Sequence, residues 1–131
     1  MDKTTLVGID IDGGEKLIST LERAGLDIRA ALWLYSSDPD KLELVIASPF
    51  IDQNGPKKTY TFIQAELAKM EPSPEIDLED ISVLSPKNRL IEALLRMREI
   101  YPTSIIKWLS REVVNGVYIE AAYIHRLKIT E

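Results

Sequence analysis

The chain has 131 residues, no cysteine, 45% hydrophobic and 28% charged side chains. This length fits one domain with one hydrophobic core, and the composition excludes disordered and fibrous proteins. Without cysteine there is no disulfide bond, thiolate nucleophile or thiolate metal site. No stretch approaches the roughly 20 apolar residues of a membrane span, and residues 1–11 lack the apolar run of a secretory signal. We therefore expect a cytoplasmic protein that does not enter membranes.

The net charge of −5 is unevenly distributed along the chain. Residues 1–85 carry 8 basic and 16 acidic side chains, a net charge of −8, whereas residues 86–131 carry 8 basic and 5 acidic side chains, a net charge of +3. Nucleic-acid binding needs a concentrated positive potential, so we expect no nucleic-acid partner. The basic C-terminal third leaves one face suited to an anionic partner.

The first predicted helix has an apolar stripe at Leu17, Ile18, Leu21 and Ala24, and this spacing is typical of an amphipathic helix. Gly25 stands where a left-handed residue ends a helix. Two interpretations compete for the residues before this stripe.

The string Leu6-Val7-Gly8-Ile9-Asp10-Ile11-Asp12-Gly13 resembles the first motif of haloacid-dehalogenase-type phosphatases. That resemblance implies a nucleophilic first aspartate, a second aspartate as acid or base, and Mg²⁺ beside them. However, Gly14 replaces the threonine of those enzymes, and an antiparallel hairpin is predicted to follow. We favour a helix start, with Asp12 as N-cap and Glu15 completing a capping box, and expect no metal or other cofactor.

The next elements are a hairpin and a second helix. Apolar residues 27–36 and 42–48 flank a turn sequence rich in aspartate and proline, which predicts two antiparallel strands. Residues 52–56 predict a loop, with Pro56 in the first turn of the second helix. The buried stripe of that helix is predicted at Tyr60, Ile63, Leu67 and Met70. Phe62 falls on the opposite, exposed side.

A short strand at residues 81–84 precedes the third helix, for which Ser85 is the predicted N-cap and Pro86 the first helical residue. Tyr101-Pro102 ends this helix. Arg98 falls inside its apolar arc, where a guanidinium favours a carboxylate or phosphate partner. We favour the alternative that its stem lies on the core and its charge reaches water.

The last segment predicts a hairpin. Residues 105–114 and 117–129 flank Asn115-Gly116, which tolerates the positive φ angles of a type I′ turn. The two-residue turn sets the register, which pairs Arg111 with Glu120 and Trp108 with Tyr123.

Together these elements run helix, two strands, helix, strand, helix, two strands. We expect residues 1–131 to form a single α+β domain, in which a five-stranded, mostly antiparallel sheet carries three helices. Residues 1–11 are expected to form a flexible or extended N-terminal arm.

Five segments spread over most of the chain carry a resemblance to other proteins: Ala24-Gly25-Leu26-Asp27, Ala31-Leu32-Trp33-Leu34-Tyr35, Leu44-Val45-Ile46-Ala47-Ser48-Pro49, Ile81-Ser82-Val83-Leu84-Ser85-Pro86 and Asn115-Gly116-Val117-Tyr118-Ile119-Glu120. They resemble a family of small bacterial proteins with no assigned function. The resemblance implies a bacterial, cytoplasmic origin. It implies no activity and no site residue.

His125 is the only histidine, which excludes a multi-histidine metal site within one chain. Strand alternation places it on the apolar face of the last strand, so we favour a core-edge histidine bonded to backbone or water. The alternative is a lone general base. No serine or cysteine partner is indicated by spacing.

Two classes of function remain from the sequence. The first is a non-enzymatic interaction or assembly module, with a homodimer formed through Phe62, Tyr118 and Ile124. The second is a small hydrolase or an anion- or ligand-binding domain whose site is assembled from distant residues. Its candidates are Asp10, Asp12, Arg98, Glu120 and His125. Convergence of the last three in one pocket would favour this second class, although no nucleotide-loop, α/β-hydrolase or zincin motif occurs.

Overall fold

The computed structural model describes residues 9–129. In chain order the elements are α1 (Ile11–Arg23), β1 (Ala30–Ser37), β2 (Asp40–Ala47), α2 (Phe50–Ala68), the short 3₁₀ helix η2 (Leu78–Asp80), β3 (Ile81–Leu84), α3 (Arg89–Ile100), β4 (Trp108–Val114) and β5 (Val117–Leu127). This order and the α+β class confirm the prediction. Most of the expected N-terminal arm lies outside the described residues, and α1 already begins at Ile11.

The strands form one mixed sheet in the order β3-β2-β1-β5-β4. Only β2 and β3 run parallel, and the other three pairs are antiparallel. At the last hairpin Val114 pairs with Val117, and Asn115 and Gly116 have φ angles of 45° and 85°, as the predicted turn requires. The second half of the last hairpin, β5, therefore lies inside the sheet, between β1 and β4.

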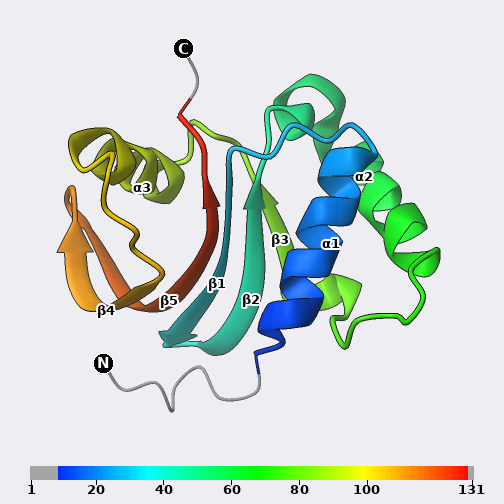
Figure 1. The fold of residues 1–131 in the computed structure, drawn as a ribbon, viewed down its shortest axis with the longest axis horizontal. Coiled ribbons are helices and arrows are strands. Elements are labelled where there is room, and N and C mark those ends of the chain that lie inside the picture. The colour runs from blue at the N-terminus through cyan, green and yellow to red at the C-terminus, as the bar shows by residue number, and fades with distance from the viewer. Residues whose placement is uncertain (1–8, 130–131) are drawn as a thin grey trace.

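Helices cover both faces of this sheet. Figure 1 shows α1 and α2 together over one part of the sheet and α3 over the other. Alternate residues of β1 divide between two cores: Ala31 and Trp33 pack with α1, whereas Ala30 and Leu32 pack with α3. Burial on both faces explains why β1 and β2 read as nearly continuous apolar runs.

The predicted N-terminal starts of all three helices need correction. Asp10, rather than Asp12, is the N-cap of α1: its Oδ1 accepts a hydrogen bond of 2.8 Å from the Gly13 backbone N–H. Asn88, rather than Ser85, caps α3 by accepting from the Leu90 N–H at 2.9 Å. In both cases a second capping residue stands nearby in the sequence, and the spacing alone does not choose between them.

Helix α2 begins earlier than predicted, because residues 50–54 are helical rather than a loop. Gly55, with φ 81° and ψ 167°, separates this first turn from the longer segment that starts at Pro56. The first turn lays Phe50 against Phe62, with ring centroids 5.7 Å apart. Phe62 is consequently half-buried at the edge of the α1–α2 core, and its predicted exposure is wrong.

Strand β5 departs twice from regular alternation. The β4–β5 pairing omits Arg111 and Glu120, and Arg111, on the neighbouring strand β4, has a left-handed φ of 48°. A β-bulge then lies at His125, because Leu32 pairs with Ile124 and Ala31 pairs with Arg126. The bulge turns His125 and Arg126 toward the same face, where both contact Glu15 of α1.

Ile124 is only 4% exposed and belongs to the core under α3, so its predicted place on a dimer surface is wrong. The prediction assumed that one face of β5 meets the core and the other meets solvent. Both faces are covered, and α3 packs on the second one. Tyr118, in contrast, is exposed. Within residues 9–129 no helix has the length and apolar character to cross a membrane.

Candidate functional site

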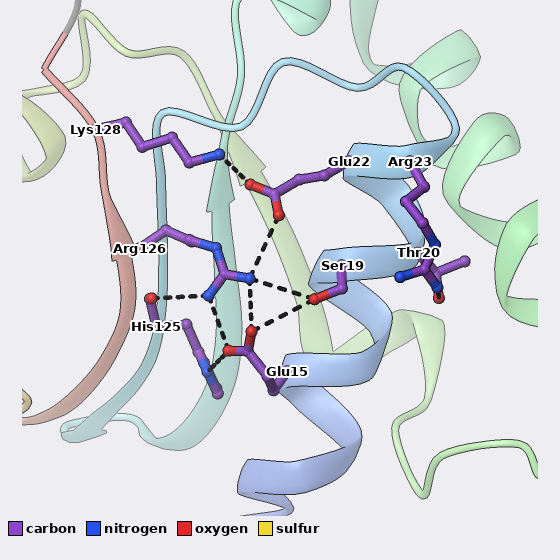
Figure 2. Close-up of polar contacts among 8 residues, drawn as sticks. All are labelled: Glu15, Ser19, Thr20, Glu22, Arg23, His125, Arg126 and Lys128. Atoms are coloured by element: carbon purple, nitrogen blue, oxygen red, sulfur yellow. Dashed lines mark hydrogen bonds and ion pairs between the residues drawn. The ribbon is translucent and has the colours of Figure 1, made fainter.

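Six polar side chains link α1 to β5, and we call them the charge cluster: Glu15, Ser19, Glu22, His125, Arg126 and Lys128 (Figure 2). The three from α1 follow the spacing i, i+4 and i+7, which places them on one helix face. His125 and Arg126 of β5 face them because of the bulge, and Lys128 follows directly after the strand. Contacts within the cluster thus hold α1 against the sheet, beside the apolar core.

Arg126 is at the centre of the cluster. Its guanidinium donates to both carboxylate oxygens of Glu15, at 2.9 and 2.5 Å, and to Glu22 at 3.3 Å. The hydrogen bonds from Arg126 hold the pKa of Glu15 at about 2, below its ordinary value of 4.5. Lys128 forms an ion pair with the other oxygen of Glu22. The bidentate geometry of the contact between Arg126 and Glu15 makes that contact the strongest kind of side-chain ion pair.

His125 lies on the buried side of the same carboxylate, with 6% of its surface exposed. Its Nδ1 is 3.1 Å from Glu15 Oε1. Burial lowers the pKa of His125 below 6.5, while the hydrogen bond to Glu15 acts in the opposite direction. The imidazole is therefore neutral near pH 7. Because ionised Glu15 can only accept, Nδ1 carries the proton and Nε2 is left as an acceptor.

The Nε2 atom of His125 and the Nε1 atom of Trp33 are both buried without a hydrogen-bond partner among residues 9–129. A Cβ atom on Gly14 would lie 3.0 Å from each of them. Glycine at position 14 is therefore what lets α1 approach the two rings so closely. A substrate cannot reach this nitrogen without displacing α1.

This arrangement limits the chemistry of the charge cluster. A carboxylate that orients an imidazole is the second half of a general-base pair, but such a base needs its other nitrogen open to a reacting group. In His125 that nitrogen has no access to solvent. The other charges of the cluster bind one another. The cluster is thus suited to holding α1 in place.

The other sequence-predicted candidates lie elsewhere. Arg98 donates to the Pro102 carbonyl oxygen just beyond α3. Glu120 accepts from the backbone N–H and the hydroxyl of Ser37, at 3.0 and 2.9 Å. Arg98 and His125 both line a hollow of about 240 Å³, but the ring of His125 bonds to α1, on the sheet face opposite α3. Arg98, Glu120 and His125 therefore share no site.

Asp10 caps α1, and Asp12 lies exposed in the first turn of the helix. Among residues 9–129 no group of three or more histidine, aspartate or glutamate side chains is placed to hold a metal ion. The structure thus gives Asp10 a structural role in place of the nucleophile that the phosphatase-like motif implied.

Sequence reasoning missed Arg126, Glu22 and Lys128, and it treated Glu15 only as a capping residue. One signal was present: Glu15, Ser19 and Glu22 form a polar stripe beside the apolar stripe of α1. The matching stripe on β5 was hidden, because regular alternation puts His125 and Arg126 on opposite faces. Only the bulge brings them together.

A second candidate site is an exposed apolar surface around the end of α3 and the β4–β5 hairpin. Its residues, which we call the α3–β4 patch, are Ile100, Tyr101, Ile105, Val113 and Tyr118. Their exposed fractions run from 51% for Ile100 to 86% for Ile105. In Figure 1 these elements lie at the end of the molecule away from α2.

A groove of about 520 Å³ lies between α3 and β4 beside the patch. Ile100, Tyr101 and Val113 line this groove, and Glu112 is the only charged residue in its lining. Tyr118 is the cross-strand neighbour of Val113. Tyr101 and Ile105 also line the hollow beside β5. Exposed apolar side chains therefore gather at this end of the sheet, at the end of α3 and on the β4–β5 hairpin, as they do at protein interaction sites.

No protein-family model matches the chain, and neither the curated proteins nor the solved structures contain a match.

Proposed function

We propose that the chain is a non-enzymatic interaction module that binds a protein through the α3–β4 patch. The supporting observation is the clustering of apolar surface. Among residues 9–129, five of the six large apolar side chains that are exposed belong to the patch. The sixth, Ile129, lies outside it. Covering such a surface with a partner removes apolar area from water, which is the main favourable term in protein association.

The candidate catalytic groups support the same proposal. The imidazole of His125 is buried, and Glu15 and Arg126 bind each other. Arg98 and Glu120 bind different parts of the backbone. A hydrolase or ligand-binding site needs several such groups converging on one accessible hollow. The interaction module requires only the patch, and a cysteine-free chain suits the reducing bacterial cytoplasm that we propose as its location.

The experiment compares partner binding by three forms of the protein. Native protein, Ile105→Glu and Ile129→Glu are each immobilised and exposed to an extract of the cells that make the chain. Bound proteins are quantified by mass spectrometry. Both substitutions place a glutamate at an exposed isoleucine, so both variants should fold, but only position 105 lies in the patch.

We expect the native protein and Ile129→Glu to bind the same partner protein, and Ile105→Glu to lose this binding. A second copy of the chain counts as a partner. Equal binding by all three forms, or no specific binding by the native protein, would contradict the proposal. Circular dichroism and thermal melting of the three forms check that the fold is unchanged.

A further inference from the structure

We infer that the partner of the α3–β4 patch is a second copy of this chain, docked about a twofold axis at strand β4. This inference rests on the proposed function. The first observation is which edge of the sheet is open. At one edge, β3 has only four residues, and the hydroxyl of Tyr60 accepts from its Val83 N–H at 2.8 Å. The other edge is β4, which has seven residues and the patch beside it.

The second observation is a pair of opposite charges at the middle of β4. Arg111 and Glu112 are adjacent and exposed, and neither side chain has an ion-pair or hydrogen-bond partner within residues 9–129. A partner that meets this edge must present a negative charge beside a positive one. Arg111 and Glu112 of a second copy of β4, running antiparallel to the first, meet that requirement.

A twofold axis perpendicular to the sheet, just outside its β4 edge and level with Arg111 and Glu112, runs the two copies of β4 antiparallel. Arg111 of each copy then lies opposite Glu112 of the other, so two reciprocal charge pairs form. The same axis brings the α3 ends of the two copies together on one face and their Val113 and Tyr118 side chains together on the other. The patch and the charges are thus both self-complementary, as a symmetric dimer requires.

The backbone of β4 decides how this contact is made. The left-handed φ of 48° at Arg111 interrupts the regular extended geometry of β4, and such irregularities at a sheet edge oppose continuous pairing with another strand. The two copies therefore meet through side chains, with apolar contacts on both sides of the charge pairs. The interruption also prevents further copies from extending the sheet.

The experiment measures self-association by sedimentation equilibrium at micromolar concentrations, with charge-reversal variants. We expect a dimer for the native protein. Arg111→Glu alone and Glu112→Arg alone should each weaken the dimer by about tenfold or more, because each variant places like charges opposite each other. The double variant restores the opposite charges and should regain dimerisation. Thermal melting confirms that each variant folds.

Three results would overturn the inference: a native protein that stays monomeric, single variants that dimerise as well as the native protein, or a double variant that does not recover. A monomer that still binds another protein through Ile105 would overturn the second copy as partner and leave the proposed function standing. A monomer that binds nothing through Ile105 would overturn both.

Discussion

Gly14 faces two buried rings at the point where α1 meets the sheet. A Cβ atom at this position would lie 3.0 Å from His125 Nε2 and from Trp33 Nε1, closer than side chains normally pack. Both rings are buried and have little room to move. The close approach of α1 to the sheet therefore depends on the absence of a side chain at position 14.

We predict that Gly14→Ala lowers the free energy of unfolding by about 1–3 kcal/mol, the usual cost of overpacking. Alanine is the better helix former by about 1 kcal/mol, so the steric effect must exceed that gain. Lys16→Ala, at an exposed position of the same helix, is the control and should change stability little. Urea denaturation of the three proteins measures the difference. A more stable Gly14→Ala variant would show that α1 is not held this closely.

His125 predicts a pH dependence of stability. Burial holds its pKa in the folded state below 6.5, with Arg126 on β5 and Lys107 before β4 acting in the same direction and Glu15 on α1 opposing them. As the pH falls, His125 therefore takes up its proton at a higher pH in the unfolded chain than in the folded protein. The free energy of unfolding is fully retained above about pH 6.5 and falls as the pH drops toward the folded-state pKa.

Urea denaturation between pH 5 and 8 measures this loss, and His125→Gln should remove it, because the carboxylates titrate at lower pH. As the only histidine, His125 also gives a single imidazole signal in an NMR titration. A native-state pKa at or above 6.5 would contradict the account.

At the scale of elements, the sequence predicts that the helices exist but not the residue at which each helix begins. The apolar stripes of α1 and α3 predict both helices, because core contacts repeat along the whole length. Their first residues were misplaced, since Asp10 and Asp12 are equally good capping residues. The choice between them depends on where the preceding chain lies, which is a tertiary property.

We predict that Asp10→Ala lowers the free energy of unfolding by about 1 kcal/mol, the typical value of an N-cap. Asp12→Ala is the matched control, since the side chain of Asp12 is exposed in the first turn and should contribute within about 0.5 kcal/mol. Thermal or urea denaturation distinguishes the two variants. The reverse order of effects would restore Asp12 as the cap.

The charge cluster shows the same division for a candidate site. The hairpin that contains β5 could be predicted from Asn115-Gly116 and from the pairing of Trp108 with Tyr123, whose rings are 4.7 Å apart in the structure. The bulge at His125 could not. A one-residue irregularity reverses the face of every later side chain, and no local residue preference indicates it. The sequence therefore indicated His125 as a candidate but did not indicate that Glu15 and Arg126 lie beside it.

The position of β5 predicts the effect of truncation. Because β5 pairs with β1 on one side and β4 on the other, deleting residues 115–131 removes a central strand and leaves β4 without a neighbour. We expect the truncated chain to lose cooperative unfolding. Calorimetry tests this, and a sharp transition near the native melting temperature would contradict it.

At the scale of the whole molecule, polar and apolar surfaces have separate roles. The charge cluster joins α1 to the sheet, and its charged side chains pair with one another. The α3–β4 patch, at the other end of the sheet, presents apolar side chains to solvent, beside Arg111 and Glu112, whose side chains have no partner within residues 9–129. Amphipathic patterns predicted that some apolar residues would be exposed. They identified Tyr118 correctly but were wrong for Phe62 and Ile124. For Ile124 the reason is that α3 covers the second face of the sheet.

The most direct test of this account is an NMR dilution series on the uniformly ¹⁵N-labelled native protein. Dilution from high to low micromolar concentration should shift the amide signals of residues 97–101, 105–114 and 118, as the dimer dissociates at the α3–β4 patch. The amides of Glu15, Ser19 and Glu22 in α1 should not move. Shifts centred on α1 or α2, or a spectrum independent of concentration, would contradict the claim that the α3–β4 patch is where this chain meets its second copy.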